Sequence, residues 1–341
     1  MKVLVTGTEG YLGCLLAPLL VADDHEVLGV DTGYYKAGWL YHDVAGSVAT
    51  LARDVRELEA SDLAGFDAVV HMAELSNDPL GDLLGEVTYD VNHGGSVRLA
   101  ELARAAGVRR FVYMSSCSVY GVAEGRVDET SPVNPQTAYA ICKARVERDV
   151  AAMADGSFAP TFLRNATAFG ASPRMRFDIV LNNLAGLAWT TGRIAMNSDG
   201  SPWRPLVHGL DIAQAIRLVL AAPEDDVRGQ VLNVGSDEQN YQVREIAGII
   251  AEEFPGCELS FGPASADNRS YEVDFTKIRE VLPGFECRWD ARRGAQQLHD
   301  VFERIQLDEA TFTGRGHTRL KQLEHLLGTG QVDADLFWTT R

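Results

Sequence analysis

Short apolar runs alternate with stretches of helical spacing along the first half of the chain. The runs are rich in β-branched and aromatic residues, which is typical of strands buried on both faces of a sheet. They lie at residues 2–6, 26–31, 67–72, 110–115 and 161–164. Between them, apolar positions recur at helical spacing and predict helices over 11–22, 87–106 and 137–153. This order predicts an α/β fold with a Rossmann-type, doubly wound parallel sheet and right-handed crossovers.

The alternation weakens after about residue 170, where Gly, Pro, Arg and Asn become frequent. Helical patterns return at 211–222 and 243–254, and the apolar run at 231–235 predicts a strand that rejoins the main sheet. We expect a first domain over 1–170, with a returning strand near 206–235, and a smaller, partly interleaved substrate-binding domain over 171–341.

The stretch from about 308 to 329 is amphipathic, with Leu320, Leu323, Leu326 and Leu327 on one side. It predicts a helix packed on the body of the protein rather than a membrane or cofactor element.

Composition and charge restrict the class of protein. With 341 residues, 46% of them hydrophobic, the chain can bury a large core, and it has no run of about 18 apolar residues that could span a membrane. A net charge of −17 disfavours nucleic acid and anionic membranes as partners. The five cysteines are an odd number without metal-ligand spacing, which predicts reduced thiols in the cytoplasm and no metal site.

A glycine turn follows the first predicted strand. In GTEGYLG, Gly7, Gly10 and Gly13 recur every third residue, and a helix is expected to open at Tyr11-Leu12. Such a turn lets backbone N–H groups approach a pyrophosphate at the start of a helix. Asp31 stands at the end of the second strand, where a carboxylate accepts hydrogen bonds from a ribose diol and repels an added phosphate. The pattern favours NAD over NADP, although Lys36 nearby keeps NADP open.

Two further segments suit the same cofactor. Asp54 could offer a carboxylate to the adenine amino group and Val55 a backbone N–H to a ring nitrogen, and a solvated loop aspartate fits equally well. Met72 and Ala73, at the end of the third strand, could flank the cofactor through their backbone.

The stretch TAYAICK carries the chemistry. Tyr139 and Lys143 lie four residues apart, so on a helix the ammonium can lower the pKa of the phenol and bind the nicotinamide ribose. Ser116, at the end of the fourth strand, could hydrogen-bond a substrate alcohol whose proton Tyr139 takes during hydride transfer. A tyrosine and a lysine four apart are often only a packing pair, but the glycine turn, acidic strand end and serine precede them here in order.

An anionic substrate would need a local cationic pocket in so acidic a protein. Five arginines of the second half are candidates, and we expect about half of them to be solvated surface residues. They are Arg164, Arg174, Arg176, Arg204 and Arg269.

From GTEGYLG through SSCSVYG and YAICK to RPLVHGLDIAQA, the chain resembles the extended short-chain dehydrogenase/reductases, in particular the nucleotide-sugar epimerases and dehydratases of the UDP-glucose 4-epimerase type. The resemblance implies an NAD site, a nucleotide-diphosphate sugar as substrate, and a homodimer formed through the helices near 90–106 and 137–153, with Cys142 near the seam. It implies cofactor contacts from Gly7, Gly10, Tyr11, Leu12, Gly13, Asp31, Asp54, Val55, Met72, Ala73, Tyr139 and Lys143, with Ser116, Tyr139 and Lys143 as the catalytic set.

Other site residues follow from the same resemblance. Asn92, in YDVNHGG, is grouped with the cofactor region and resembles a structural asparagine of the family. The implied substrate contacts are Ser118, Thr167, Asn183, Leu184, Arg204 and Arg269. Thr167 stands where many relatives have an asparagine, Asn183-Leu184 resembles the family's nucleotide-binding NNL segment, and the two arginines resemble its phosphate ligands.

The residues after Ser116 narrow the expected reaction. The family's dehydratases carry Asp and Glu there as acid and base, and its decarboxylases keep a glutamate. Here the positions are Cys117 and Ser118, neither of which is a carboxyl group. This favours epimerisation at sugar carbon 4, with a 4-ketoreductase or dehydrogenase of an activated sugar as the alternative. A dinucleotide sensor without catalysis is the third possibility, disfavoured because Ser116, Tyr139 and Lys143 are all present.

Overall fold

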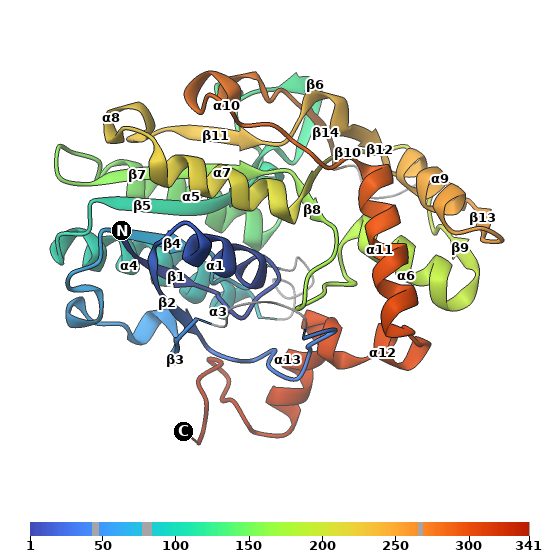
Figure 1. Cartoon of the computed structure of the whole chain (residues 1–341), viewed down its shortest axis with the longest axis horizontal. Coiled ribbons are helices and arrows are strands. Elements are labelled where there is room, and N and C mark those ends of the chain that lie inside the picture. The colour runs from blue at the N-terminus through green and yellow to red at the C-terminus, as the bar shows by residue number, and fades with distance from the viewer. Residues whose placement is uncertain (43–47, 77–83, 265–268, 341) are drawn as a thin grey trace.

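The computed structural model describes residues 1–42, 48–76, 84–264 and 269–340. Within them, seven parallel strands form the central sheet, in the order β11-β7-β5-β4-β1-β2-β3 (Figure 1). The strands are β1 (Lys2–Thr6), β2 (Glu26–Asp31), β3 (Thr50–Ala52), β4 (Ala68–His71), β5 (Arg110–Ser116), β7 (Ala159–Asn165) and β11 (Val231–Val234). The chain order turns back between β1 and β4, which places the ligand crevice of such sheets at their carboxyl ends. The predicted Rossmann-type fold is confirmed, and β11 rejoins the sheet beside β7 as expected.

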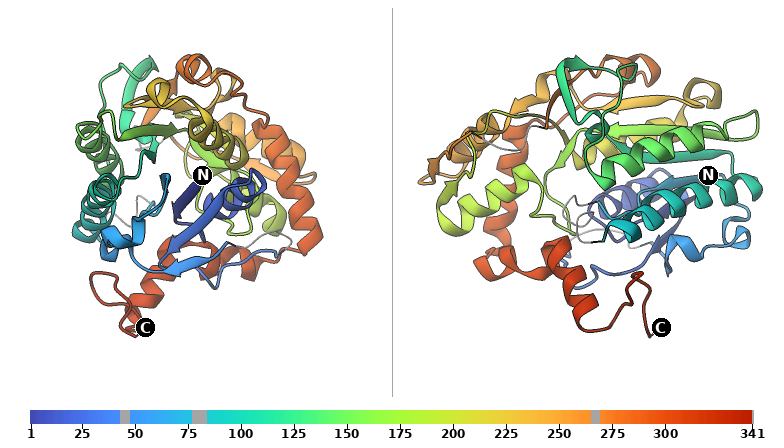
Figure 2. Two further views of the ribbon diagram at one scale, coloured as in Figure 1. Left: turned by 60° about the vertical axis from the view of Figure 1, so that its left-hand side comes forward. Right: turned by 180° about the vertical axis from the view of Figure 1, so that it is seen from behind.

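Successive side chains of each strand enter opposite faces of the sheet. Val3 and Val5 pack beneath helices α1 (Gly13–Ala22) and α7 (Gly209–Ala221), on the face seen in Figure 1. Leu4 points the other way, toward α4 (Ser96–Ala105) and α5 (Ala138–Ala151), which lie in front in the right-hand view of Figure 2. Both faces are therefore covered, which explains why the strands read as continuous apolar runs.

The helix predicted over 87–106 is interrupted. The segment consists of α3 (Gly85–Tyr89), a π-helical turn at Asp90–Gly95, and then α4. Ser96 donates to the carbonyl of Asn92 (2.6 Å), and the side chain of Asn92 is held by the backbone of Leu75. These side-chain bonds compete with the regular helical ladder and account for the interruption.

A second body packs beside the carboxyl ends of the strands (right side of Figure 1). Its core joins α6 (Val180–Thr191), α9 (Val243–Glu253) and α11 (Ala291–Ile305). Of these, only α9 was predicted. Helix α6 is buried on most sides and shows no clear apolar stripe, whereas the spacing of Ala295, Leu298 and Phe302 in α11 is that of an amphipathic helix and was overlooked.

Small sheets connect the two bodies. Strand β10 pairs with β8 and β12, β6 with β14, and β9 with β13, so β10 does not join the main sheet. Their bounds are β6 (Val122–Val127), β8 (Thr167–Phe169), β9 (Arg193–Ala195), β10 (Trp203–His208), β12 (Asn240–Gln242), β13 (Glu258–Ser260) and β14 (Ser270–Val273). Two short helices, α8 (Glu224–Val227) and α10 (Thr276–Val281), complete the region around β11.

The C-terminal helix predicted over 308–329 is two helices, α12 (Glu309–Thr313) and α13 (Arg319–Gly328). The break contains Gly316, whose backbone lies so close to Gly38 that a Cβ on Gly38 would stand 1.9 Å from the Gly316 carbonyl oxygen. Helix α13 packs on the body as expected, with Leu323 and Leu326 against Tyr34 below the β2–β3 edge (Figure 1). The described residues include no helix long and apolar enough to cross a membrane.

Candidate active site

A cavity of about 620 Å³ lies at the carboxyl ends of β1, β2, β4 and β5, between the sheet and the second body. It collects most of the site residues expected from the sequence. Those that line it are Gly7, Gly10, Tyr11, Leu12, Gly13, Asp31, Asp54, Val55, Met72, Ala73, Ser116, Ser118, Tyr139, Lys143, Thr167, Arg204 and Arg269. Asn92, Asn183 and Leu184 are not among the lining residues.

Two positions of the glycine turn, Gly7 and Gly13, cannot readily carry a side chain. A Cβ on Gly13 would lie 2.1 Å from the carbonyl oxygen of Gly7, and Gly7 itself has a φ of +76°. Helix α1 therefore starts at Gly13, tightly packed on the turn, and its N-terminus opens into the cavity. Among the described residues, the backbone N–H groups of Tyr11 and Leu12 have no acceptor. This cradle fits a pyrophosphate.

Asp31 is held in place at the tip of β2. Its carboxylate accepts N–H bonds from Glu9 (3.0 Å) and Gly33 (2.8 Å). Burial raises the pKa of Asp31, and these two bonds oppose that rise. Lys36 does not line the cavity, and it forms an ion pair with Glu9 (3.7 Å) instead. The carboxylate suits a ribose diol and repels an added phosphate.

Asp54 is not the solvated loop residue that the sequence left as an alternative. It is buried, caps the short helical turn that starts at Val55, and forms an ion pair with Arg56 (2.8 Å). Met72 and Ala73 both donate their N–H groups to Thr6 Oγ1 (3.1 Å each). A backbone contact from this pair to a ligand must therefore use the carbonyl oxygens.

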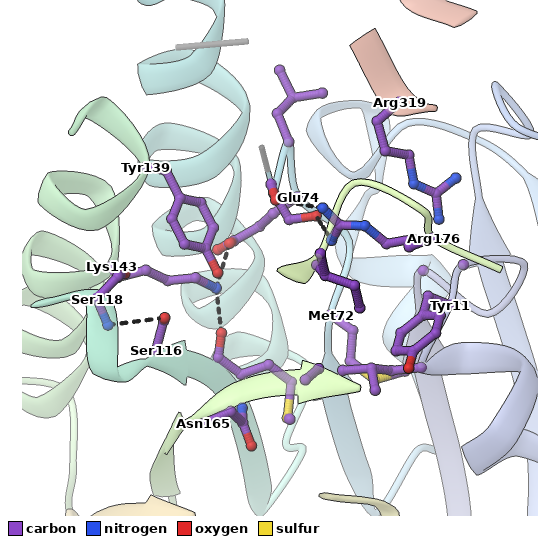
Figure 3. Close-up of a pocket in the computed structure, with 18 of the residues that line it drawn as sticks. Tyr11, Met72, Glu74, Ser116, Ser118, Tyr139, Lys143, Asn165, Arg176 and Arg319 are labelled. Carbon is purple, nitrogen blue, oxygen red and sulfur yellow. Dashed lines mark hydrogen bonds and ion pairs between the residues drawn. The ribbon is translucent and has the colours of Figure 1, made fainter. Parts of the chain in front are cut away.

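Ser116, Tyr139 and Lys143 meet at one end of the cavity (Figure 3). Thr137 caps α5 by accepting the N–H of Ala140 (3.2 Å), so Tyr139 and Lys143 fall on consecutive turns. The Lys143 ammonium lies 5.3 Å from the centre of the Tyr139 ring. Ser116, at the end of β5, accepts the N–H of Ser118 (3.1 Å), and its hydroxyl also hydrogen-bonds the Tyr139 side chain, which lowers the pKa of the phenol.

Glu74 is a cavity residue that the sequence analysis missed. Its side chain is 2% exposed, forms an ion pair with the Lys143 ammonium, and accepts the Tyr113 hydroxyl (2.6 Å). Lys143 also donates to the Met114 carbonyl oxygen. The signal was a carboxylate just after a buried strand, at the sheet edge that also presents Ser116.

These charges set the proton affinity of the phenol. Burial raises the pKa of Tyr139, the Lys143 ammonium lowers it, and the Glu74 carboxylate raises it again, leaving it above its ordinary value. Lys143 acts in the expected direction but does not dominate. Burial lowers the pKa of Lys143, but Glu74, Tyr139 and Glu147 together raise it above its ordinary value, so the ammonium stays charged.

Asn165 and Ser118 present polar atoms to the cavity. Asn165 donates to the carbonyls of Ser115 (3.1 Å) and Leu163 (3.0 Å), while its Oδ1 is buried and has no partner in the described part of the chain. The Ser118 hydroxyl is in the same state. Asn165 was missed, although it ends β7 two residues before Thr167 and beside Ser116 of β5. Both atoms could bind sugar hydroxyls.

The five candidate arginines divide differently from the prediction, since none is exposed. Arg176, Arg204 and Arg269 line the cavity. Arg164 forms a buried ion pair with Glu147 (2.6 Å). Arg174 donates to the backbone carbonyls of Tyr35 and Lys36, and its guanidinium stacks on the Trp39 ring (4.2 Å). The two arginines outside the cavity are thus internal cross-links, not surface groups.

The predicted substrate residues Asn183 and Leu184 lie outside the cavity lining. Helix α6 starts at Val180, so Asn183 turns back to donate to the Phe177 carbonyl (2.9 Å) and Leu184 enters the core. Asp178, Ile179 and Val180 line the cavity in their place. Asn92 likewise belongs to the framework, because it bonds the N–H (2.8 Å) and the carbonyl (3.0 Å) of Leu75.

Comparison with known proteins accounts for this arrangement. The sequence model of the NAD dependent epimerase/dehydratase family matches residues 3–235. The chain belongs to this family. It is 31% identical over 308 residues to the UDP-glucose 4-epimerase of Mycolicibacterium smegmatis, covering 83% of this chain and 92% of that protein. It is 28% identical over 314 residues to the low-salt glycan biosynthesis protein Agl12 of Haloferax volcanii, covering 89% and 98%.

A solved structure agrees with the family assignment. MoeE5, in complex with UDP-glucuronic acid and NAD, superposes with a TM-score of 0.77 at 28% identity, covering 89% of this chain and 99% of MoeE5. The family predicted from the motifs is confirmed, and so is NAD as the cofactor of this NAD-dependent enzyme. The glycine turn and Asp31 fit that cofactor by their geometry alone.

Proposed function

We propose that this member of the epimerase/dehydratase family is an NAD-dependent nucleotide-sugar epimerase acting at sugar carbon 4. The observation that carries the proposal is the meeting of Ser116, Tyr139 and Lys143 in the cavity that also contains the glycine turn. Cys117 cannot supply acid or base for elimination. It is 1% exposed, and its thiol donates to the Arg164 carbonyl (3.1 Å), away from the cavity.

The relatives support the class of substrate. The protein from Mycolicibacterium smegmatis is a UDP-glucose 4-epimerase, and MoeE5 has been solved with UDP-glucose as well as with UDP-glucuronic acid. We infer that this chain also takes a sugar linked to a nucleoside diphosphate. The diphosphate would meet the N-terminus of α6 together with Arg204 and Arg269, because helix N-termini and guanidinium groups bind phosphate oxygens well.

Each catalytic side chain has a separate role at carbon 4. Tyr139 takes the proton of the sugar hydroxyl, and Ser116 orients that hydroxyl by a hydrogen bond. Lys143 stabilises the phenolate that accepts this proton, and the resulting phenol returns the proton to the sugar oxygen as the alcohol re-forms. NAD supplies the hydride acceptor and donor. Unpartnered polar atoms on Asn165 and Ser118 can hold the keto sugar in either orientation, which lets both faces of its carbonyl be reduced.

The test uses purified protein without added cofactor. Incubated with UDP-glucose or UDP-galactose, it should interconvert the configuration at carbon 4, as followed by NMR, with no net NADH produced. A stoichiometric requirement for added reductant would favour a ketoreductase or dehydrogenase instead. Absence of turnover with every nucleotide sugar offered would refute the proposal.

We also propose a cytoplasmic homodimer built through α4 and α5. Five free cysteines suit a reducing compartment. Cys142 is fully buried beneath Thr88 of its own chain, so it would not form part of the seam itself. Light scattering on the purified protein tests the dimer, and a monomer mass would exclude it.

A further inference from the structure

Arg319 brings a buried positive charge to the cavity from the far end of the chain. It is the first residue of α13, is 8% exposed, and lines the cavity. Its guanidinium stacks on the Tyr35 ring at 3.8 Å. In the described part of the chain, no carboxylate or carbonyl oxygen bonds to it. Figure 3 shows its side chain on the same side of the cavity as Tyr11 and Arg176.

The framework holds Arg319 in this position. One turn further along α13, Gln322 donates to the Tyr34 carbonyl (2.8 Å), and Leu323 is fully buried. Beyond the helix, the indole of Trp338 donates to the Thr32 carbonyl (2.8 Å). Helix α13 and the segment after it are thus fastened to the loop that follows β2, which holds the Arg319 backbone beside the cavity.

A guanidinium removed from water needs an anion. The charged groups that act on Arg319 are Asp31 and Asp178 as anions and Arg176 as a cation, together with the Tyr35 phenol. Arg176 is already paired with Asp178 (2.8 Å), and Asp31 is engaged by two backbone N–H groups. Arg319 therefore remains available for an anion that enters the cavity.

We propose that Arg319 is a cofactor-binding residue that pairs with the pyrophosphate of the bound dinucleotide. Its stacking on Tyr35, in the loop that follows β2, places it in the cavity on the side of Asp31 and the glycine turn, where the pyrophosphate of NAD would meet the start of α1. The substrate diphosphate is expected elsewhere, beside Arg204 and Arg269. Arg319 lies outside the segment that matches the family model, so this contact belongs to the C-terminal part of this chain. The inference rests on the cofactor and not on the sugar or the reaction.

Calorimetric titration of nucleotide-free protein tests the pairing. In Arg319→Gln, the Kd values for NAD and ADP-ribose should rise about 10- to 100-fold, the effect of losing a charge-assisted bidentate contact. The Kd for UDP should stay within about twofold, because its diphosphate is expected beside Arg204 and Arg269 and not beside Arg319. The matched control is Lys321→Gln, which removes one exposed positive charge from the same helix and should leave all three affinities unchanged.

The affinities of the Arg319 variants decide whether this guanidinium binds the dinucleotide. Unchanged NAD affinity in folded Arg319→Gln would overturn the inference, and a loss confined to UDP would assign the guanidinium to the substrate diphosphate instead. If Arg319→Gln does not fold, Arg319→Lys carries the test: it keeps the charge but loses the planar fork, so NAD should bind several-fold more weakly, and equal binding would refute the contact. If the unaltered protein binds no dinucleotide at all, the proposed function fails, which is a separate result.

Discussion

The two walls of the cavity are built differently. The sheet wall, made by the carboxyl ends of the strands and by α5, balances its charges internally: Lys143 with Glu74, and Asp54 with Arg56. The opposite wall, made by α6, β10 and α13, presents arginines toward the cavity, among them Arg319, to which no carboxylate in the described part of the chain is bonded. The sheet wall is thus complete without ligand, whereas the opposite wall obtains part of its charge balance from what it binds. Changes in the first should alter chemistry, and changes in the second should alter affinity.

The largest effect should come from the sheet wall at Tyr139. Tyr139→Phe removes the only proton acceptor proposed at carbon 4, so turnover should fall by about 10³-fold, within the usual range of general acid–base contributions. Bound NAD should be retained, because the backbone of the glycine turn and Asp31 are untouched. Turnover is followed by NMR and cofactor content by mass spectrometry of the released nucleotides. Unchanged turnover would exclude Tyr139 as the proton acceptor.

A second change tests the internal charge balance. Glu74→Gln leaves the Lys143 ammonium buried without its carboxylate and should destabilise the protein by about 3 kcal/mol in urea unfolding. The pH–rate profile should move as a whole to lower pH. Glu74 raises the pKa of both Tyr139 and Lys143, so its neutralisation lets the phenol lose its proton, and the ammonium lose its charge, at lower pH.

Tyr113→Phe is the control for this shift. It removes the hydrogen bond to Glu74 (2.6 Å) but leaves the carboxylate charge beside Lys143. Both limbs of its pH profile should stay close to those of the unaltered protein. If Glu74→Gln loses stability without moving either limb, Glu74 serves the fold and does not tune the proton transfer.

The sheet wall could largely be predicted from the sequence, whereas the opposite wall could not. Positions on the sheet wall follow from local rules: strands such as 2–6 appear as apolar runs, and Gly13 and Asp31 follow at fixed distances from them. Gly13 has no room for a Cβ and Gly7 has a positive φ, so these two positions require glycine and their signal is present in the sequence itself.

The opposite wall depends on contacts between distant segments. Arg319 reaches the cavity only because α13 is fastened to residues nearly 300 positions earlier, through Gln322 and the Tyr34 carbonyl. No local pattern distinguishes this arginine from Arg164, which is equally buried but pairs with Glu147. The place of Asn183 outside the cavity lining has the same origin, since it depends on where α6 begins.

A change on the opposite wall should affect affinity. Arg269→Gln removes a proposed ligand of the substrate diphosphate, so KM for the nucleotide sugar should rise about tenfold while kcat stays within about threefold. Arg244→Gln removes a charge whose side chain is 45% exposed, and serves as the control with unchanged KM. A fall in kcat alone would place Arg269 with the reacting groups and would contradict the assignment of affinity to the opposite wall.

The smallest effect is expected at Lys36, which stands near Asp31 but outside the cavity. Its side chain is 57% exposed and pairs with Glu9 at 3.7 Å, a geometry worth little in water. Lys36→Gln should therefore change the Kd for NAD by no more than about twofold. The informative ligand is NADP, because a lysine that receives a 2′-phosphate would lose NADP affinity selectively on substitution. Calorimetry with both dinucleotides measures this directly. Equal, small changes in the Kd values for NAD and NADP would leave Asp31 as the group that excludes the 2′-phosphate. A selective loss of NADP binding would show that the sheet wall also carries a positive charge that binds ligand.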